Sequence, residues 1–290
     1  MSSPTSTTDK QASELVLRIR SYGPVAVALS GGVDSSVVAK AAYEAWGKEA
    51  LAVTGQSPSV AREELQLAQE VARQIGIRHV LIDTHEFENQ NYIANDGSRC
   101  YHCKSELYAR IVERRRDLGV DIICSGANAD DRGDYRPGLR AAAEHGVRHP
   151  LDELGYTKSV VRELARYWNL PNWDKPAAPC LSSRIAVGVE ATPQRTHRVE
   201  EAERFLRAEG FRQFRVRHHA DELARIEVEE GDLARFADPA LRQRVVQTLT
   251  SLGFRFVSLD LIGFRSGSLN VMVPAELLRS TASKHADGSL

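Results

Sequence analysis

Glycine, serine and aspartate residues cluster in one short segment whose composition suits the binding of a phosphate group. Residues 30–36 read Ser-Gly-Gly-Val-Asp-Ser-Ser and follow a short apolar run at residues 25–29. We expect that run to be a buried parallel strand and the residues from Asp34 onward to be a helix. Two adjacent glycines let the backbone turn tightly, and a helix N-terminus offers unpaired N–H groups that favour anions.

The side chains of this segment extend the phosphate hypothesis to ATP and Mg²⁺. Serine hydroxyls can bond phosphate oxygens, and a carboxylate at an anion site indicates a cation, so Asp34 is a predicted Mg²⁺ ligand. The segment lacks the lysine of the GxxxxGK[ST] loop and resembles the SGGxDS loop of PP-loop ATP pyrophosphatases, which cleave ATP to AMP and pyrophosphate. An ordinary glycine-rich turn with a capping aspartate is the alternative. The predicted nucleotide-binding residues here are Ser30, Gly31, Gly32, Asp34, Ser35 and Ser36.

The cysteines offer a second kind of chemistry. Cys100-Tyr-His-Cys103 is a CxxC just before a helix predicted to begin near residue 104, and a helix N-terminus lowers a thiol pKa. Cys180 lies in a proline-rich loop, and loops at one end of an α/β sheet can meet. Three converging thiolates could hold a [4Fe–4S] cluster through three irons, leaving the fourth open to hydrosulfide. Incidental surface thiols, or a zinc site completed by His102, are the alternatives, and Cys124 is expected in the core.

Composition indicates an ordinary globular protein without a bulk charge. The chain has 290 residues, of which 42% are hydrophobic and 27% charged, and its net charge is −1, so no basic field favours nucleic acid. We find no segment long and apolar enough to cross a membrane. Residues 1–11 are polar and are expected to be a disordered lead-in, and the expected compartment is the cytoplasm. In a reducing compartment, metal or catalytic roles for cysteine are favoured over disulfides.

Alternating strand and helix patterns predict a doubly wound α/β domain over residues 12–185. The expected strands are residues 25–29, 50–54, 79–83 and 121–125, and the expected helices are residues 34–46, 60–75, 104–117 and 158–168. Such alternation implies a parallel sheet covered by helices on both faces. Ligands of these sheets bind at the carboxyl ends of the strands, where the glycine-rich segment lies.

A smaller α+β domain is predicted for residues 186–277, after a proline-rich loop that marks the boundary. The expected elements are a helix at 194–209, strands at 212–218 and 223–229, a helix at 238–251 and a strand at 254–262. This order suggests a ferredoxin-like split βαβ arrangement. Residues 278–290 are expected to be a disordered tail.

Together these features resemble the LarE family, the PP-loop sulfur transferases of nickel-pincer nucleotide biosynthesis. The motifs that carry the resemblance are residues 30–36, 134–139 (Asp-Tyr-Arg-Pro-Gly-Leu), 180–184 (Cys-Leu-Ser-Ser-Arg), 215–217 (Arg-Val-Arg) and 259–267 (Leu-Asp-Leu-Ile-Gly-Phe-Arg-Ser-Gly). They span nearly the whole folded chain, and their order makes the match specific. The resemblance implies an adenine nucleotide alpha hydrolase-like fold, the cofactors ATP and Mg²⁺, and a homo-oligomer.

The resemblance also implies a two-step reaction on pyridinium-3,5-biscarboxylic acid mononucleotide. ATP first adenylylates a carboxylate and releases pyrophosphate, and sulfur then displaces AMP to leave a thiocarboxylate. Some family members sacrifice the sulfur of the cysteine that matches Cys180, and others are thought to use a [4Fe–4S] cluster that carries sulfide. Because Cys100 and Cys103 accompany Cys180, we favour the cluster type, with sulfide or another sulfur donor as a partner.

Basic residues in the C-terminal half are the predicted substrate ligands. Alternation along a strand puts Arg215 and Arg217 on one face, where both could bind a phosphate or carboxylate, although a solvated strand face is the alternative. Arg184, next to Ser183, is a further anion ligand unless it forms a structural ion pair. The resemblance implies the same substrate-binding residues, which are Ser183, Arg184, Arg215 and Arg217.

Several other residues complete the predicted site. Gly126 would let the nucleotide approach the backbone, and Asp131 either faces ATP or Mg²⁺ or caps a turn. Lys158 and Arg162 lie one helical turn apart and could touch phosphate, although such pairs are more often solvated. The resemblance implies a catalytic set of Cys180, Asp34, Arg215, Arg217 and Glu203, with Asp232 as a less certainly aligned acid.

Three other functions remain open on the sequence alone. A tRNA thiolase can combine a PP-loop with three cluster cysteines, but the near-neutral charge argues against RNA binding. An ATP-dependent ligase or amidotransferase of the GMP- or NAD-synthetase kind would use ammonia and would not need three cysteines near the nucleotide. A non-catalytic nucleotide sensor would fail to exchange pyrophosphate into ATP.

Overall fold

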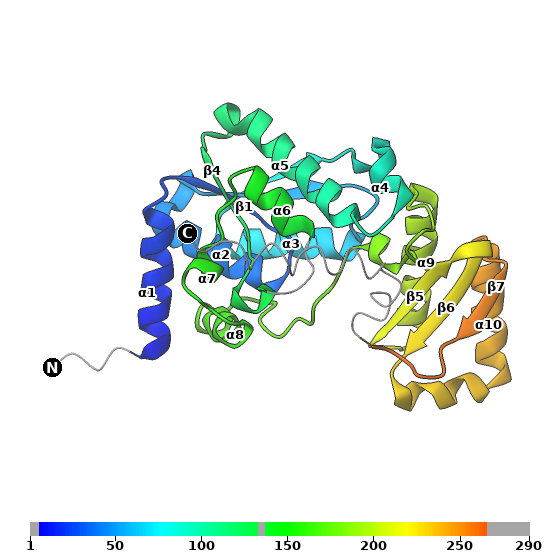
Figure 1. Cartoon of the computed structure of the whole chain (residues 1–290). Helices are drawn as coiled ribbons and strands as arrows, with labels where there is room; N and C mark the ends of the chain where they lie inside the picture. The colour runs from blue at the N-terminus through cyan, green and yellow to red at the C-terminus, as the bar shows by residue number, and fades with distance from the viewer. Residues whose placement is uncertain (1–5, 133–136, 266–290) are drawn as a thin grey trace. The chain divides into compact units, whose positions relative to one another are not determined.

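The structure, a computed structural model, describes residues 6–132 and 137–265, which form two compact units (Figure 1). Unit 1 comprises residues 1–86 and 100–178, and unit 2 comprises residues 87–99 and 179–290. The expected boundary after residue 185 therefore needs correction. The loop carrying Cys180 belongs to unit 2 because Arg184 pairs with Glu203 and Ile185 forms a β-bridge with His218.

Unit 1 contains a four-stranded parallel sheet with the strand order β3-β2-β1-β4. Its strands are β1 (Val25–Ala28), β2 (Leu51–Gln56), β3 (Arg78–Asp83) and β4 (Ile122–Cys124). Strand β1 lies between β2 and β4, with Ala26 opposite both Leu51 and Ile123. All four predicted strands and the doubly wound α/β fold class are confirmed. The central position of β1 explains why its sequence is apolar without alternation.

Helices cover both faces of this sheet (Figure 1). They are α1 (Thr7–Arg20), α2 (Val33–Trp46), α3 (Arg62–Ile75), α5 (Arg99–Leu118), α6 (Pro137–Glu144), α7 (Pro150–Glu153) and α8 (Lys158–Tyr167). One face packs against α1, α2, α3 and α8, and the other packs against α5 and α6. No helix within the described ranges is both long enough and apolar enough to cross a membrane.

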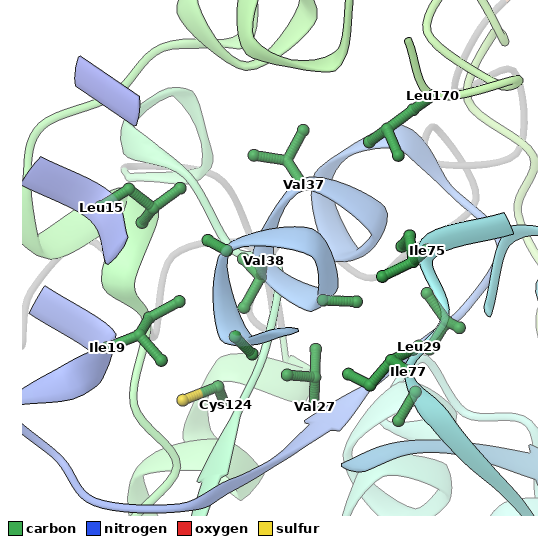
Figure 2. Close-up of a cluster of buried hydrophobic side chains, with 14 of the residues drawn as sticks. Leu15, Ile19, Val27, Leu29, Val37, Val38, Ile75, Ile77, Cys124 and Leu170 are labelled. Carbon is green, nitrogen blue, oxygen red and sulfur yellow. The ribbon is translucent and has the colours of Figure 1, made fainter. Parts of the chain in front are cut away.

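The larger core of unit 1 fastens α2 against β1, and this contact sets the position of the glycine-rich loop between them (Figure 2). Val27 and Leu29 pack with Val37 and Val38, and all four are at most 2% exposed. Cys124 from β4 is fully buried in the same cluster, so the predicted core role of this cysteine is confirmed. The loop therefore begins and ends on rigid elements.

Unit 2 contains a three-stranded sheet with the order β5-β6-β7. Its elements are α4 (Gln90–Ala94), α9 (Pro193–Ala208), β5 (Phe214–His219), β6 (Leu223–Val228), α10 (Pro239–Ser251) and β7 (Phe256–Leu259). Strands β5 and β6 are antiparallel, and β6 pairs directly with β7 in parallel. The ferredoxin-like split βαβ prediction is therefore wrong. The tight β5–β6 connection puts β5 on one edge of β6 and leaves the other edge to β7, so no strand lies between the parallel pair.

The start of the chain also differs from expectation, because α1 begins at Thr7 inside the supposed lead-in of residues 1–11. The Ser6 hydroxyl accepts a hydrogen bond from the Asp9 backbone N–H at 3.1 Å, which caps the helix. A serine followed three residues later by an acid is a recognisable capping signature that a reading based on polarity overlooks. The expected tail at 278–290, residues 134–136 and residues 266–267 lie outside the described residues.

Replacing Ile226 by alanine should destabilise unit 2 by about 2–4 kcal/mol, because the side chain is 1% exposed and its loss leaves a cavity. The matched control is Ile262→Ala, since Ile262 is 67% exposed and its truncation should change stability by less than about 0.5 kcal/mol. Urea unfolding followed by circular dichroism measures both values. Equal effects of the two substitutions would contradict the assignment of Ile226 to the core.

Candidate functional site

The glycine-rich loop lies at the carboxyl edge of the unit 1 sheet, between β1 and the first turn of α2. Gly31 has φ +73°, and a Cβ there would lie 3.1 Å from the Glu64 carbonyl oxygen and 3.3 Å from the Ala68 nitrogen. Both conditions favour glycine. Gly32 is the N-cap of α2 and supplies no side-chain cap, so the first N–H groups of the helix are available to an external anion.

The serines of this loop form hydrogen bonds that stabilise the turn. The Ser35 and Ser36 hydroxyls donate to the Gly32 carbonyl oxygen at 3.1 Å and 2.8 Å. The Ser30 and Ser35 hydroxyl oxygens lie 3.1 Å apart and bond to each other. Ser30 is exposed while the other two serines are buried, and contact of any of the three with a phosphate stays a prediction.

Gly126, just after β4, packs against the first turn of α2 more closely than any side chain would allow. A Cβ at this position would lie 2.5 Å from the Ser35 nitrogen and 2.9 Å from the Ser35 Cα. These are backbone atoms that cannot move independently of the helix. Glycine is therefore required for the contact between two segments of the site, and its predicted direct approach to the nucleotide stays a prediction.

Asp34 is held by two side chains that come from other loops. The Asn128 side-chain nitrogen donates to Asp34 Oδ1 at 3.1 Å, and the Lys158 ammonium forms a close ion pair with Asp34 Oδ2. Mg²⁺ binding by Asp34 stays a prediction. The sequence predicted contact of Lys158 with phosphate or a solvated position, and it could not reveal the pairing with Asp34, which lies 124 positions away in sequence.

Asp131 has the capping role that the sequence left open for it. Its carboxylate accepts a hydrogen bond from the Asn128 backbone N–H at 3.0 Å, and the Asn128 side chain accepts one from the Asp130 N–H at 3.0 Å. This reciprocal capping box fixes the orientation of Asn128, whose amide then reaches Asp34. Contact of Asp131 with ATP or Mg²⁺ stays a prediction.

Two residues that the sequence analysis did not single out donate hydrogen bonds to the glycine-rich loop. The Asn172 side-chain nitrogen donates to the Gly31 carbonyl oxygen and to the Ser36 hydroxyl, each at 2.9 Å. Lys175 donates to the same carbonyl at 3.3 Å and pairs with Glu64. Both residues lie in the proline-rich loop, far from Gly31 in sequence, and no local pattern could reveal the contact.

None of the four cysteines is in a disulfide, and they differ in burial. Helix α5 begins at Arg99, earlier than predicted, so Cys100 and Cys103 lie in its first turn at i, i+3 spacing and on one face. Cys100 is exposed, while Cys103 and Cys180 are partly buried. Burial raises the pKa of Cys124 to about 12, which removes it as a thiolate ligand.

In unit 2, Arg184 is a buried residue that fastens the Cys180 loop. Its Nε donates to Glu203 at 3.1 Å, and its Nη1 donates to the Cys180 carbonyl oxygen at 2.9 Å and also to the Pro179 carbonyl oxygen. Glu203 also accepts from the Val216 backbone N–H at 3.2 Å. These contacts match the structural ion pair that the sequence left open. Substrate binding by Arg184 and catalysis by Glu203 stay predictions.

Arg215 and Arg217 differ sharply in their surroundings, although both lie on β5. Arg217 is 6% exposed and pairs with Glu227 at 2.9 Å. Arg215 is half-buried and, among the described residues, has no carboxylate within ion-pair distance. Burial, together with the nearby Arg184 and Arg217 charges, lowers the pKa of Arg215 to about 10. Arg215 is the cation of this group that an anionic ligand would best stabilise.

Comparison with known proteins matches this architecture to an ATP-using family. The Asparagine synthase family profile matches residues 13–95, which include the glycine-rich loop. A pyridinium-3,5-bisthiocarboxylic acid mononucleotide synthase of Lactiplantibacillus plantarum is 37% identical over 88% of this chain and 92% of its own length. The chain belongs to the LarE family. The predicted resemblance is confirmed, and the protein is a PP-loop enzyme, an ATP-using sulfurtransferase.

Two further relatives of this LarE-family chain differ in how far the similarity extends. An uncharacterized protein of Synechocystis is 47% identical over 84% of this chain and 91% of its own length. A tRNA-specific 2-thiouridylase MnmA of Beijerinckia indica is 32% identical, but the match covers only 52% of this chain and 44% of that protein. Similarity to the LarE relative thus includes unit 2, whereas similarity to the thiouridylase covers about half of the chain.

Replacing Gly126 by alanine should lower the affinity for Mg·ATP by about tenfold or more, because the new methyl group displaces the first turn of α2. Isothermal titration calorimetry measures the affinity. Gly231→Ala is the matched control, since a Cβ there meets nothing within 4 Å. Unchanged ATP affinity in the Gly126 variant would contradict a nucleotide site at this turn.

Iodoacetamide at pH 8 should label Cys100, Cys103 and Cys180 of the metal-free protein and leave Cys124 unlabelled. With a pKa of about 12, only about one Cys124 thiol in ten thousand is ionised at that pH, and the side chain is fully buried. Peptide mass spectrometry quantifies each site. Labelling in urea is the control that shows all four thiols to be competent. Labelling of native Cys124 at the rate of Cys100 would refute its place in the core.

Proposed function

We propose that this LarE-family enzyme uses ATP to activate a carboxylate of pyridinium-3,5-biscarboxylic acid mononucleotide and then replaces AMP with sulfur to form a thiocarboxylate. The proposal is supported by the first turn of α2, which has no side-chain cap and offers N–H groups to a triphosphate. This turn occurs in a chain that is similar, over nearly its full length, to a synthase of the bisthiocarboxylic product. The name of that relative gives the bisthiocarboxylic product, and the resemblance to the LarE family implies the biscarboxylic precursor.

Activation by ATP is needed because a carboxylate has only oxide as a leaving group. An oxygen of the substrate carboxylate attacks the α-phosphorus of ATP. The bond from that phosphorus to the bridging oxygen breaks, and pyrophosphate leaves with the electron pair. The α2 N–H groups and the Lys158 ammonium would stabilise the departing charge. Asp34 offers the carboxylate oxygens that suit Mg²⁺, which when bound would neutralise further phosphate charge.

Sulfur transfer completes the reaction. A sulfur nucleophile attacks the carbonyl carbon of the acyl adenylate, the bond from that carbon to the AMP oxygen breaks, and AMP leaves. We propose that Cys100, Cys103 and Cys180 hold a [4Fe–4S] cluster, which would present sulfide taken from an external sulfur donor for this attack, so that the cluster itself is not consumed. The donor set fits such a group, because thiolates are the usual ligands of iron–sulfur clusters and none of these three cysteines is buried or in a disulfide.

Substrate binding is assigned to the arginines of unit 2. Arg215 would bind the phosphate or a carboxylate of the mononucleotide, since it is a half-buried cation without a carboxylate partner among the described residues. The partners of Arg184 and Arg217 already balance their charges, so these two residues would support the site through the Ser183 and Cys180 backbone. Ser183 donates to the Cys180 carbonyl oxygen at 2.7 Å and belongs to the same loop.

The proposal is tested by measuring iron, acid-labile sulfide and products after strictly anaerobic purification. We expect about four iron and four sulfide per chain, and multiple turnovers that release AMP and pyrophosphate with the thiocarboxylate. Asp34→Asn should abolish pyrophosphate release. Cys100→Ala should keep pyrophosphate release and lose iron, retaining at most one turnover through the Cys180 sulfur.

Controls separate the two sulfur sources from an unrelated activity. Cys124→Ser serves as the matched thiol control and should keep iron and turnover, because Cys124 is a core residue. Multiple turnovers without iron would refute the cluster mechanism, and a loss of sulfur from Cys180 would establish its sacrifice. Incorporation of ammonia in place of sulfur would assign the protein to the ligases.

A further inference from the structure

A buried asparagine in unit 2 joins two chain segments that lead to the predicted cluster cysteines. Asn95 follows α4, is 1% exposed and has a left-handed backbone with φ 51°. Its side-chain nitrogen donates to the Ala186 and Val189 carbonyl oxygens at 2.9 Å, and to that of Ile185 at 3.4 Å. A single amide thus binds three carbonyls of the loop that follows Cys180.

The rest of Asn95 is bonded to the same two segments. Its backbone carbonyl accepts a hydrogen bond from the Gly188 N–H at 3.0 Å, and the Ala191 N–H donates to the Ile93 carbonyl at 2.8 Å. Its side-chain oxygen accepts from the Arg99 guanidinium, which directly precedes Cys100 in sequence. Asn95 therefore contacts both the segment before the CxxC and the loop after Cys180.

Asparagine suits this position for three physical reasons. Its amide donates to carbonyls and accepts from a guanidinium at once, which neither aspartate nor leucine can do. Asparagine tolerates the left-handed backbone better than most residues. Removal of the amide takes a side-chain hydrogen bond from each of the three loop carbonyls, and among the described residues only that of Ala186 keeps another donor, the Val189 backbone N–H at 3.0 Å, so the loop should loosen. A second buried bond, between the Tyr92 and Ser182 hydroxyls at 2.8 Å, links the same segments.

We infer that Asn95 is a positioning residue for sulfur transfer. Its hydrogen bonds keep the loop that begins at Cys180 in a fixed position relative to the segment that ends at Arg99. The inference rests on the proposed function, because only sulfur transfer gives a common task to the segment that precedes Cys100 and the loop that begins at Cys180. ATP activation takes place at the α2 turn of unit 1, whose described contacts do not include Asn95, so the two steps should respond differently to its loss.

The test compares Asn95→Gly with Asn169→Gly in the full-length protein. Glycine keeps the left-handed backbone favourable in both cases, since Asn169 has φ 52°. Asn169 is exposed, and within the described ranges its side chain makes no hydrogen bond, so its replacement removes no comparable contact. Hydrogen–deuterium exchange reports the loop at residues 185–191, and product analysis separates pyrophosphate release from thiocarboxylate formation.

In Asn95→Gly we expect amide protection in residues 185–191 to fall about tenfold or more while protection in β5 and β6 is kept. Pyrophosphate release should stay within about twofold of wild type, and thiocarboxylate formed per pyrophosphate should fall about tenfold or more. Asn169→Gly should match wild type in all three measurements. The ratio of the two products is the readout that a purely structural role would not change.

Two outcomes would overturn the inference. If Asn95→Gly forms thiocarboxylate and pyrophosphate in the wild-type ratio, with or without a loss of amide protection, the hydrogen bonds of Asn95 have no part in sulfur transfer. Equal losses of pyrophosphate and thiocarboxylate would show general damage. In both cases the proposed function would stand if the wild-type enzyme performs both steps. A wild-type protein that releases no pyrophosphate would instead overturn the proposed function, and with it this inference.

Discussion

The close packing of Gly126 against the first turn of α2 is the constraint on which the nucleotide site depends. Because this turn has no side-chain cap, its N–H groups stay available to an anion. The shared core of β1 and α2 holds the turn in place. Gly126 brings the next loop against the turn, and Asn128 from that loop then reaches Asp34. The backbone proposed to bind phosphate and the candidate metal ligand are thus positioned by packing that only glycine permits.

Charged side chains that already have an oppositely charged partner are suited to support the candidate site, whereas a charged side chain without such a partner can bind a ligand. Asp34 pairs with Lys158, and Arg184 and Arg217 each have a buried carboxylate partner, so each of these charges is balanced within the chain. Arg215 is the exception among the arginines of β5, and its lowered pKa reflects burial near other cations. An anion would reverse that unfavourable environment, which is why Arg215 is assigned to the substrate.

Strand and helix positions in unit 1 were predictable because buried parallel strands are short, apolar and separated by amphipathic helices. The arrangement of unit 2 was not. Strand lengths and spacings there fit a split βαβ unit equally well, and only the pairing of β6 with β7 excluded it. The role of residues 87–99 was hidden for a similar reason, since the amide of Asn95 meets loop residues about ninety positions away.

The sequence by itself determined the chemistry available to this protein: the Ser30–Ser36 segment and the family motifs identify an ATP-using sulfurtransferase. Residue types and local spacing suffice for that, because they set which donors and acceptors exist. The tertiary structure decided which of them are engaged with one another. Lys158 meets Asp34, Asn172 supports Gly31, and Arg184 holds the Cys180 loop. These partners are remote in sequence, and hydrogen-bond and ion-pair energies depend on distances that only the folded chain defines.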